Sequence, residues 1–252
     1  MKAIMLAAGV GSRLFGDDGG QPPKSLLEFG GMTLLQRNIE VLKTNGVDEL
    51  VMVVGYRKDE IMAEAIKHGD GFVRFIDNPD FRRGPVISLW LAREVLRGGD
   101  DVLFMDADVL YHPDLLGRLI ASAHGNCFVF DHGVDHCIEA VKLCIRDGAP
   151  VEFGKGVEGD FDQVGEWPGF LKYSPPMAAK LAAALQTYID ADDLDSPYEP
   201  AMRDVLLSEP PGTFGVEDIT GLPWIEIDFP EDMDHAKDQV LPRINGAKIL
   251  SP

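Results

Sequence analysis

The first half of the chain alternates short apolar runs with amphipathic stretches, and this alternation limits its possible folds more than any other feature. The apolar runs are rich in β-branched residues and bounded by Gly, Asp or Asn, which is typical of buried strands. They are Ala3–Ala8, Leu50–Val54, Val73–Ile76 and Val102–Met105. Helical periodicity is found in Leu34–Lys43, Asp59–Lys67, Ser88–Leu96 and Pro113–Ala123. This order predicts parallel strands with right-handed crossovers in a doubly wound sheet, which binds ligands beyond the carboxyl ends of its strands.

The second half of the chain has a different pattern. Three apolar runs, the last two flanking Asp147-Gly148, indicate antiparallel strands with a hairpin turn: Cys127–Asp131, Glu139–Arg146 and Ala149–Lys155. Further strands are expected over Gly165–Lys172 and Trp224–Asp228, and helices over Met177–Ile189, Ala201–Leu207 and Glu231–Val240. No internal repeat or long linker divides the chain. We therefore expect one three-layer α/β domain, with a mostly parallel central sheet and antiparallel additions.

The charge of the chain narrows the partners that it can bind. It carries 23 Lys and Arg against 42 Asp and Glu, a formal net charge of −19. Such a chain repels phosphate backbones and anionic lipid surfaces, so we expect neither nucleic-acid nor membrane binding. The three cysteines form no C-x-x-C pair, which argues against a disulfide scaffold or a structural zinc site. No apolar run resembles a signal peptide or a transmembrane helix, and we expect a cytoplasmic enzyme.

A glycine-rich segment, LAAGVGSRL, follows the first apolar run and spans residues 6–14. Small residues let backbone N–H groups approach an anion closely, and Arg13 can clamp a phosphate. Lys24 follows after further glycines and can close over a phosphate as a point charge. The alternatives are that the segment is a purely structural turn and that Lys24 is a solvated loop lysine. The segment is neither GxxxxGK[ST] nor GxGxxG, because Leu14 stands where the third glycine would be.

Two pairs of carboxylates follow apolar runs at the spacing i, i+2. They are Asp106 with Asp108, and Glu226 with Asp228. Residues at this spacing share one side of an extended chain, and oxygen ligands suit Mg²⁺ together with substrate phosphates. The alternative for Asp106 is that it caps the next turn. The alternative for Glu226 and Asp228 is that they lie on a solvent-exposed face of a strand. If both pairs converge on one cation, their like charges are tolerated at close range.

Lysines are scarce in the second half of the chain, so Lys142 and Lys155 stand out there. Lys142 and Lys155 lie on the two strands of the expected hairpin. Either they form a pair that faces an anionic substrate, or they are isolated lysines that protect the edge of a sheet. Arg82-Arg83 fits either a solvated turn, which we favour, or the mouth of a substrate site. The six histidines have no ligand spacing.

Together these segments resemble the nucleotidyltransferase family, whose members join a nucleoside triphosphate to a phosphorylated small molecule and release pyrophosphate. The resemblance covers nearly the whole chain. It rests on LAAGVGSRL, Lys24–Leu35 with the preceding Pro23, Val53–Tyr56, Asn78-Pro79, Ser88-Leu89, Asp106–Asp108 and Glu226–Asp228. The chain is more similar to phosphocholine, aminoethylphosphonate and inositol-phosphate cytidylyltransferases than to the longer sugar-nucleotide enzymes. Its short length, its two acidic motifs and the two lysines of the hairpin support that choice.

The resemblance implies a GT-A-like nucleotidyltransferase fold over residues 1–252, with residues 1–125 binding CTP and 126–252 binding the acceptor. Arg13 and Lys24 would be catalytic. Nucleotide binding would involve Leu6, Ala7, Ala8, Gly9, Gly11, Ser12, Arg13, Lys24, Gly55, Ser88 and Asp106. Mg²⁺ would be held by Asp108, Glu226 and Asp228, and the acceptor by Lys142, Lys155, Glu166 and Glu199. A homodimer is compatible with the sequence.

Other functions and other acceptors stay open on the sequence. A sugar-1-phosphate nucleotidyltransferase and a non-catalytic nucleotide-binding module are alternatives, whereas the N-terminal signature argues against a GT-A-like glycosyltransferase. Two aspartates lie between Leu14 and Pro22, and Gly84–Ile87 stands where some relatives carry asparagines. A choline acceptor would need an aromatic and acidic cage. Candidates for its walls are Trp90, Trp167, Tyr173 and Tyr198, with Glu166 and Glu199.

Overall fold

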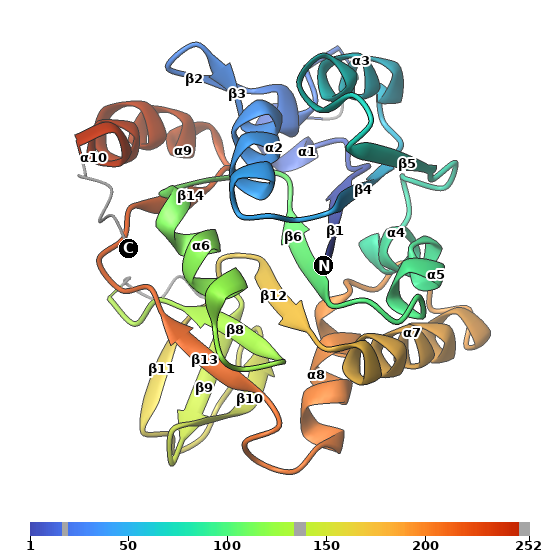
Figure 1. Cartoon of the computed structure of the whole chain (residues 1–252), viewed down its shortest axis with the longest axis vertical. Coiled ribbons are helices and arrows are strands. Elements are labelled where there is room, and N and C mark those ends of the chain that lie inside the picture. The colour runs from blue at the N-terminus through green and yellow to red at the C-terminus, as the bar shows by residue number, and fades with distance from the viewer. Residues whose placement is uncertain (17–19, 134–139, 247–252) are drawn as a thin grey trace.

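The computed structural model describes residues 1–16, 20–133 and 140–246. Its centre is a seven-stranded sheet with the strand order β13-β8-β12-β6-β1-β4-β5 (Figure 1). These strands are β1 (Lys2–Ala7), β4 (Glu49–Val54), β5 (Val73–Asp77), β6 (Val102–Asp106), β8 (Cys127–Phe130), β12 (Phe170–Tyr173) and β13 (Gly215–Asp218). All neighbours are parallel except β12, which runs antiparallel to both β6 and β8. The expected mostly parallel sheet with an antiparallel addition is therefore confirmed.

Helices cover both faces of this sheet because its strands are apolar on both faces. In β1, Ile4 packs into one core, and Ala3 and Met5 pack into the other. The first core contacts α4 (Pro85–Leu91), α5 (Arg93–Leu96), α7 (Pro175–Asp190) and α8 (Glu199–Ser208). The second contacts α2 (Leu34–Thr44), α3 (Lys58–Gly69) and α6 (Pro113–Ala121) (Figure 1). The three layers expected from the sequence are confirmed.

Smaller sheets and short helices complete the edge of the molecule. The antiparallel sheet β10-β9-β11 contains β9 (Lys142–Arg146), β10 (Ala149–Gly154) and β11 (Gln163–Glu166), and its β9–β10 turn at Asp147-Gly148 confirms the predicted hairpin. Two-stranded sheets pair β2 (Glu28–Phe29) with β3 (Met32–Thr33), and β7 (Val109–Tyr111) with β14 (Trp224–Glu226). The short helices are α1 (Ser12–Phe15), η1 (Lys24–Leu26), α9 (Pro230–His235), η2 (Ala236–Val240) and α10 (Leu241–Gly246).

Three expectations about elements are wrong. The single strand over Gly165–Lys172 is two strands in different sheets, because Trp167-Pro168-Gly169 turns the chain between β11 and β12 and Gly169 has a φ of +90°. The helix over Ser88–Leu96 is interrupted at Ala92 and becomes α4 and α5. The last helix extends beyond Val240 as α10 after a π-helical turn. Strand β13 was not expected, since Gly215–Asp218 has a single apolar side chain.

Some predictions fall outside the part of the chain that the structure describes. These are Cys137, Glu139 at the start of the expected strand, and the aspartates between Leu14 and Pro22. Cys127 and Cys144 are buried as free thiols. Within residues 1–16, 20–133 and 140–246, every helix is too short or too polar to cross a membrane.

Candidate active site

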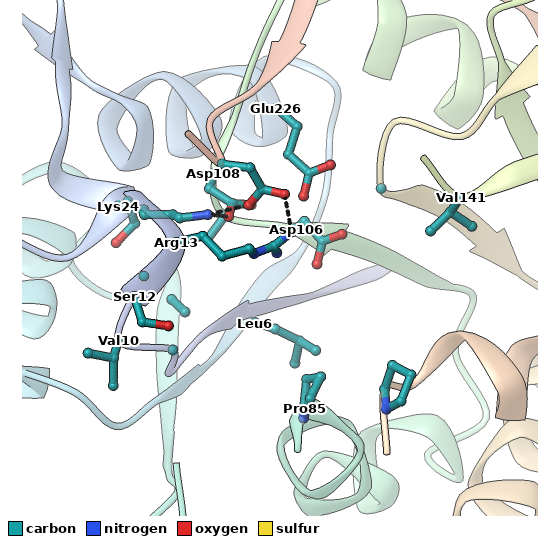
Figure 2. A pocket seen from close by; sticks show the side chains of 18 of the residues that line it. Leu6, Val10, Ser12, Arg13, Lys24, Pro85, Asp106, Asp108, Val141 and Glu226 are labelled. Carbon is teal, nitrogen blue, oxygen red and sulfur yellow. Dashed lines mark hydrogen bonds and ion pairs between the residues drawn. The ribbon is translucent and has the colours of Figure 1, made fainter. Parts of the chain in front are cut away.

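A cavity of about 970 Å³ lies beyond the carboxyl ends of β1 and β6, where a doubly wound sheet places its ligands. Figure 2 shows that Leu6 and Pro85 lie on one side and that Arg13, Lys24 and the carboxylates lie on the other. The lining includes most of the residues expected to bind a nucleotide or a metal. These are Leu6, Ala7, Ala8, Gly9, Gly11, Ser12, Arg13, Lys24, Ser88, Asp106, Asp108, Glu226 and Asp228.

The glycine-rich segment places two basic side chains at this cavity. Gly11 has a φ of +72° and precedes α1, whose second residue is Arg13. A Cβ at Gly11 would lie 3.2 Å from Cγ of Lys24, so the missing side chain leaves room for the lysine stem. Lys24 begins η1. Both side chains point at the carboxylates that lie on the same side of the cavity (Figure 2).

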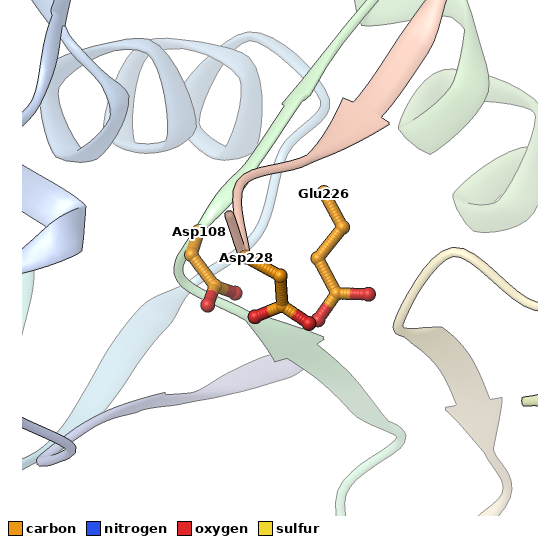
Figure 3. A group of neighbouring side chains, drawn as sticks. All are labelled: Asp108, Glu226 and Asp228. Atoms are coloured by element: carbon orange, nitrogen blue, oxygen red, sulfur yellow. The ribbon is translucent and has the colours of Figure 1, made fainter. Parts of the chain in front are cut away.

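Strand pairing brings together three carboxylates that are far apart in the sequence. β14 runs antiparallel to β7 with Glu226 opposite Val109, and the N–H of Ile227 donates to the carbonyl of Asp108 at 3.0 Å. Each of Asp108, Glu226 and Asp228 therefore offers a carboxylate oxygen, and these oxygens lie within 4.8 Å of one another (Figure 3). Asp106 is not part of this cluster.

Lys24 lies between two of these carboxylates. Its Nζ is 2.9 Å from Oδ2 of Asp108 and 2.6 Å from Oδ1 of Asp228. Nη1 of Arg13 lies 2.7 Å from Oδ2 of Asp228. Burial alone would lower the pKa of Lys24, but Asp108 and Asp228 outweigh it and raise that pKa. The ammonium thus stays protonated and compensates part of the negative charge.

Glu226 has no hydrogen-bond or ion-pair partner for its side chain among the residues that the structure describes. Burial, and then the charges of Asp108 and Asp228, raise the pKa of Glu226 to about 8. Three carboxylates against two basic groups leave the cluster with an excess negative charge when all are ionised. Carboxylate oxygens that converge in this way fit a divalent cation such as Mg²⁺, which would relieve that charge.

Asp106 forms a separate contact at the floor of the cavity. The hydroxyl of Tyr198 donates to both of its oxygens, at 2.8 and 2.6 Å. Burial, followed by the charges of Asp108 and Glu226, raises the pKa of Asp106 well above its ordinary value. Asp106 therefore connects the end of β6 to the residue that precedes α8.

Ser88 and Gly55 were both expected at the nucleotide. Ser88 is buried in the lining, and its Oγ accepts a hydrogen bond of 2.9 Å from Asn78. Gly55 lies outside the lining. A Cβ there would be 2.5 Å from Cβ of Phe81 and 3.1 Å from Cβ of Ala8, both of which do line the cavity. Gly55 thus lets two lining residues pack against the backbone behind them.

Of the four residues expected to bind the acceptor, Lys155, Glu166 and Glu199 line the cavity and Lys142 does not. Lys142 lies opposite Glu166 of the neighbouring strand β11. Burial, and then the charge of Asp131, raise the pKa of Glu166, and the charge of Lys142 offsets part of this rise. Oε2 of Glu199 is buried without a hydrogen-bond partner among the described residues, and burial raises the pKa of this carboxyl.

Two of the four aromatic candidates are in place. Trp167 and Tyr198 line the cavity, whereas Tyr173 is fully buried in the core and Trp90 donates to Gln186 outside the cavity. The favoured interpretation of Arg82-Arg83 as a solvated turn is incomplete, because both residues also line the cavity.

Sequence reasoning missed several other lining residues: Phe81, Pro85, Trp224, Phe229 and His235. Phe81 follows β5, whose carboxyl end lies at the same edge of the sheet as the site, and that position was the available signal. Trp224 begins β14, the strand that carries Glu226, and its indole donates to Asp131 at 2.8 Å.

Comparison with known proteins identifies the group of proteins that this chain resembles. Residues 3–191 match the family described as the MobA-like NTP transferase domain. The chain is 28% identical over 261 residues to the CMP-5'-(3-aminopropyl)phosphonate synthase of Streptomyces rubellomurinus, covering 99% of this chain and 40% of the synthase. It is 25% identical over 252 residues to the CTP:phosphoglutamine cytidylyltransferase of Campylobacter jejuni, covering 93% and 98%. This chain therefore spans less than half of the first relative and nearly all of the second.

The fold is also found among solved structures. The CTP:phosphocholine cytidylyltransferase of Streptococcus pneumoniae superposes with a TM-score of 0.73 at 23% identity, covering 94% of this chain and 97% of that one.

Proposed function

The chain belongs to the MobA-like NTP transferase domain family, and we propose that it is a cytidylyltransferase within that family. The proposed reaction joins CTP to a small phosphorylated or phosphonylated amine. An acceptor oxygen attacks the α-phosphorus of CTP, the bond from that phosphorus to the bridging oxygen breaks, and pyrophosphate leaves. The observation that carries the proposal is the meeting of Asp108, Glu226 and Asp228 with Lys24 and Arg13 at one cavity.

Arg13 and Lys24 are the residues that we assign to the triphosphate. Both already lie at the carboxylates, so phosphate oxygens beside this cluster would be within their reach. Their charges neutralise the negative charge that develops on the leaving pyrophosphate. The backbone of Ala8, Gly9 and Gly11 supplies the close approach that a nucleotide needs, and Ser88 lies on the same wall.

Asp108, Glu226 and Asp228 would hold Mg²⁺. When bound, the ion neutralises the charge of the phosphates and acts as a Lewis acid at the reacting centre. The three side chains would hold the ion just beyond the end of β6, beside Arg13 and Lys24.

We assign the acceptor to a different set of residues that line the same cavity. Lys155 is the group that we assign to its phosphate or phosphonate, and Glu166 and Glu199 to its amine; Trp167 and Tyr198 line the same cavity. An ammonium group is favoured by carboxylates and by aromatic faces. Both curated relatives described above have names that specify an acceptor of this kind. A role for Lys142, the division at residue 125 and a homodimer stay predictions.

A matrix of substrates tests the proposed function. CTP, UTP, GTP and dTTP are each combined with phosphocholine, phosphoethanolamine, aminoalkylphosphonates, inositol phosphate and glucose-1-phosphate, and released pyrophosphate is measured. We expect release with CTP and a phosphorylated or phosphonylated amine, and its loss in Asp108→Asn. Turnover of a sugar-1-phosphate with another nucleotide would contradict the proposal, as would an Asp108→Asn variant of normal activity.

A further inference from the structure

A second cavity of about 630 Å³ adjoins the candidate active site. It lies between the end of the β10 hairpin and the first two turns of α8, and its lining contains Phe153, Val157, Tyr188 and Pro200. Lys155, Pro197 and Glu199 line both cavities. The two spaces therefore share one wall, and two of its three residues, Lys155 and Glu199, are assigned above to the acceptor.

The shared wall carries an unsatisfied polar atom. Oε2 of Glu199 is buried and accepts no hydrogen bond from the described residues. Lys155 is close enough for its charge to act on Glu199, but it does not bond to this oxygen. A buried carboxylate oxygen without a donor costs free energy, which an ammonium or hydroxyl group of a ligand would recover.

The second cavity is acidic rather than neutral. Its lining has the four carboxylates of Glu152, Glu158, Glu199 and Asp204 against the two cationic groups of Lys155 and Arg203. Arg203 is already held by Glu152, with 2.7 Å between Nη2 and Oε2, and Asp204 accepts a hydrogen bond of 2.8 Å from Tyr188. The remaining charge favours a cation and repels an anion, while Phe153, Val157 and Pro200 suit a carbon chain.

We propose that the second cavity is the distal part of the acceptor site: a long acceptor extends past Lys155 so that its amine meets Glu199 from the second cavity, whereas the amine of a short acceptor meets Glu166 and Glu199 from the first. This inference rests on the proposed function. It specifies the acceptor as a phosphorylated or phosphonylated amine whose chain is longer than three carbons. Acceptors that end in a carboxylate are disfavoured by the same charges.

A series of phosphonates tests this inference. The two-, three- and six-carbon ω-aminoalkylphosphonates are compared with hexylphosphonate and 6-phosphonohexanoate, and kcat/KM is measured with CTP. We expect the six-carbon amine to exceed hexylphosphonate by about tenfold and the carboxylate by more, because only the amine finds a counter-charge. Turnover confined to the two- and three-carbon amines would overturn the inference and leave the proposed function intact.

Filling the second cavity provides the matched variant. Val157→Trp should lower kcat/KM for the six-carbon amine by about tenfold while changing that for the two-carbon amine less than about twofold. Activity on the short amine shows that the variant is folded, and Ile66→Trp, on the exposed face of α3, is the control. Equal losses for both amines would overturn the inference. No turnover of any acceptor would overturn the proposed function itself, and this inference with it.

Discussion

At the scale of single residues, Lys24 has two roles that oppose each other. Its ammonium lies between Asp108 and Asp228, where it supplies positive charge to carboxylates that we assign to Mg²⁺. The same ammonium is assigned to the triphosphate. Binding of metal and CTP therefore requires Lys24 to exchange carboxylate partners for phosphate oxygens. The cluster is stable without a metal because the lysine compensates it in part.

Lys24→Met tests both roles. Turnover should fall by about 100-fold or more, since a charge that stabilises the transition state is lost. Without Lys24 the carboxylates repel each other, so Mg²⁺ should raise the Tm of the variant more than that of the wild type. Thermal unfolding with and without Mg²⁺ measures this effect. Lys58→Met, which removes an exposed pair with Asp77, is the control. Equal Mg²⁺ shifts in variant and wild type would contradict the assignment.

The raised pKa of Glu226 predicts how the stability of the metal-free protein depends on pH. Its pKa is raised from the ordinary 4.5 to about 8, so the folded chain holds a proton that the unfolded chain has released between these values. The free energy of unfolding of the metal-free protein should therefore fall as pH rises through this window, by a contribution that Glu226→Gln lacks. Denaturant unfolding of both proteins at pH 5, 6, 7 and 8 measures the difference. Parallel curves would show that Glu226 is ionised throughout.

Some residues of the site can be predicted from a local sequence pattern, whereas others depend on contacts between residues that are far apart in the sequence. Arg13, Lys24 and Asp108 were predicted because each lies in a local pattern at the end of a strand, and the structure brings all three to one cavity. The contact of Tyr198 with Asp106 spans 92 residues of sequence, and no local pattern encodes it. Lys142 was placed at the cavity from its position on a hairpin, but a hairpin pattern does not specify which residues reach a neighbouring site.

At the scale of elements, the turn before α4 holds the segment that carries Tyr198 and Glu199. The N–H of Gly84 donates to the carbonyl of Leu194 at 2.9 Å. A Cβ at Gly84 would lie 2.4 Å from the carbonyl carbon of Asp195, so only glycine permits this approach. Arg83 adds a two-fold contact with Asp195, at 2.9 and 3.0 Å. The close packing of Gly84 against Asp195 thus explains why glycine stands at this position.

Gly84→Ala should displace this segment and raise the KM for the acceptor more than that for CTP. The reason is that Tyr198 and Glu199 follow the displaced residues, whereas Arg13 and Lys24 do not contact them. Arg83→Gln should have a smaller effect, because an exposed ion pair contributes about 0–1 kcal/mol. Steady-state kinetics with each substrate varied measures both. Gly246→Ala, whose new Cβ meets nothing within 4 Å, is the control. An unchanged acceptor KM in Gly84→Ala would contradict this account.

The elements that could be predicted well are those with a distinctive local sequence pattern. Every parallel strand of the first half was found within about two residues, because continuous apolar runs bounded by turn residues are distinctive. β13 was missed because it depends on its neighbour β8 for pairing and has little apolar character of its own. The break between β11 and β12 was missed because Trp167 and Phe170 are both apolar and conceal the turn at Pro168-Gly169.

At the scale of the whole molecule, the site is complete only when both halves of the chain have folded together. The sheet places β12 of the second half beside β6 of the first, and β8 and β13 follow outward from β12. The pairing of β7 with β14 then joins Asp108 to Glu226 and Asp228. The net charge of −19 predicts that polyanions are repelled, and the structure brings a few basic groups, Arg13, Lys24 and Lys155, to the cavity of this acidic chain.

The most direct test of the account is to follow the phosphorus atoms of a single reaction mixture. The protein, CTP, Mg²⁺ and an aminoalkylphosphonate are combined, and the products are observed by ³¹P NMR with and without a chelator. We predict that triphosphate signals give way to pyrophosphate and, in equal amount, to a mixed anhydride of CMP and the phosphonate, and that chelation stops both. CTP that stays intact, or is hydrolysed to CMP without the mixed anhydride, would contradict the assignment of this site to cytidylyl transfer.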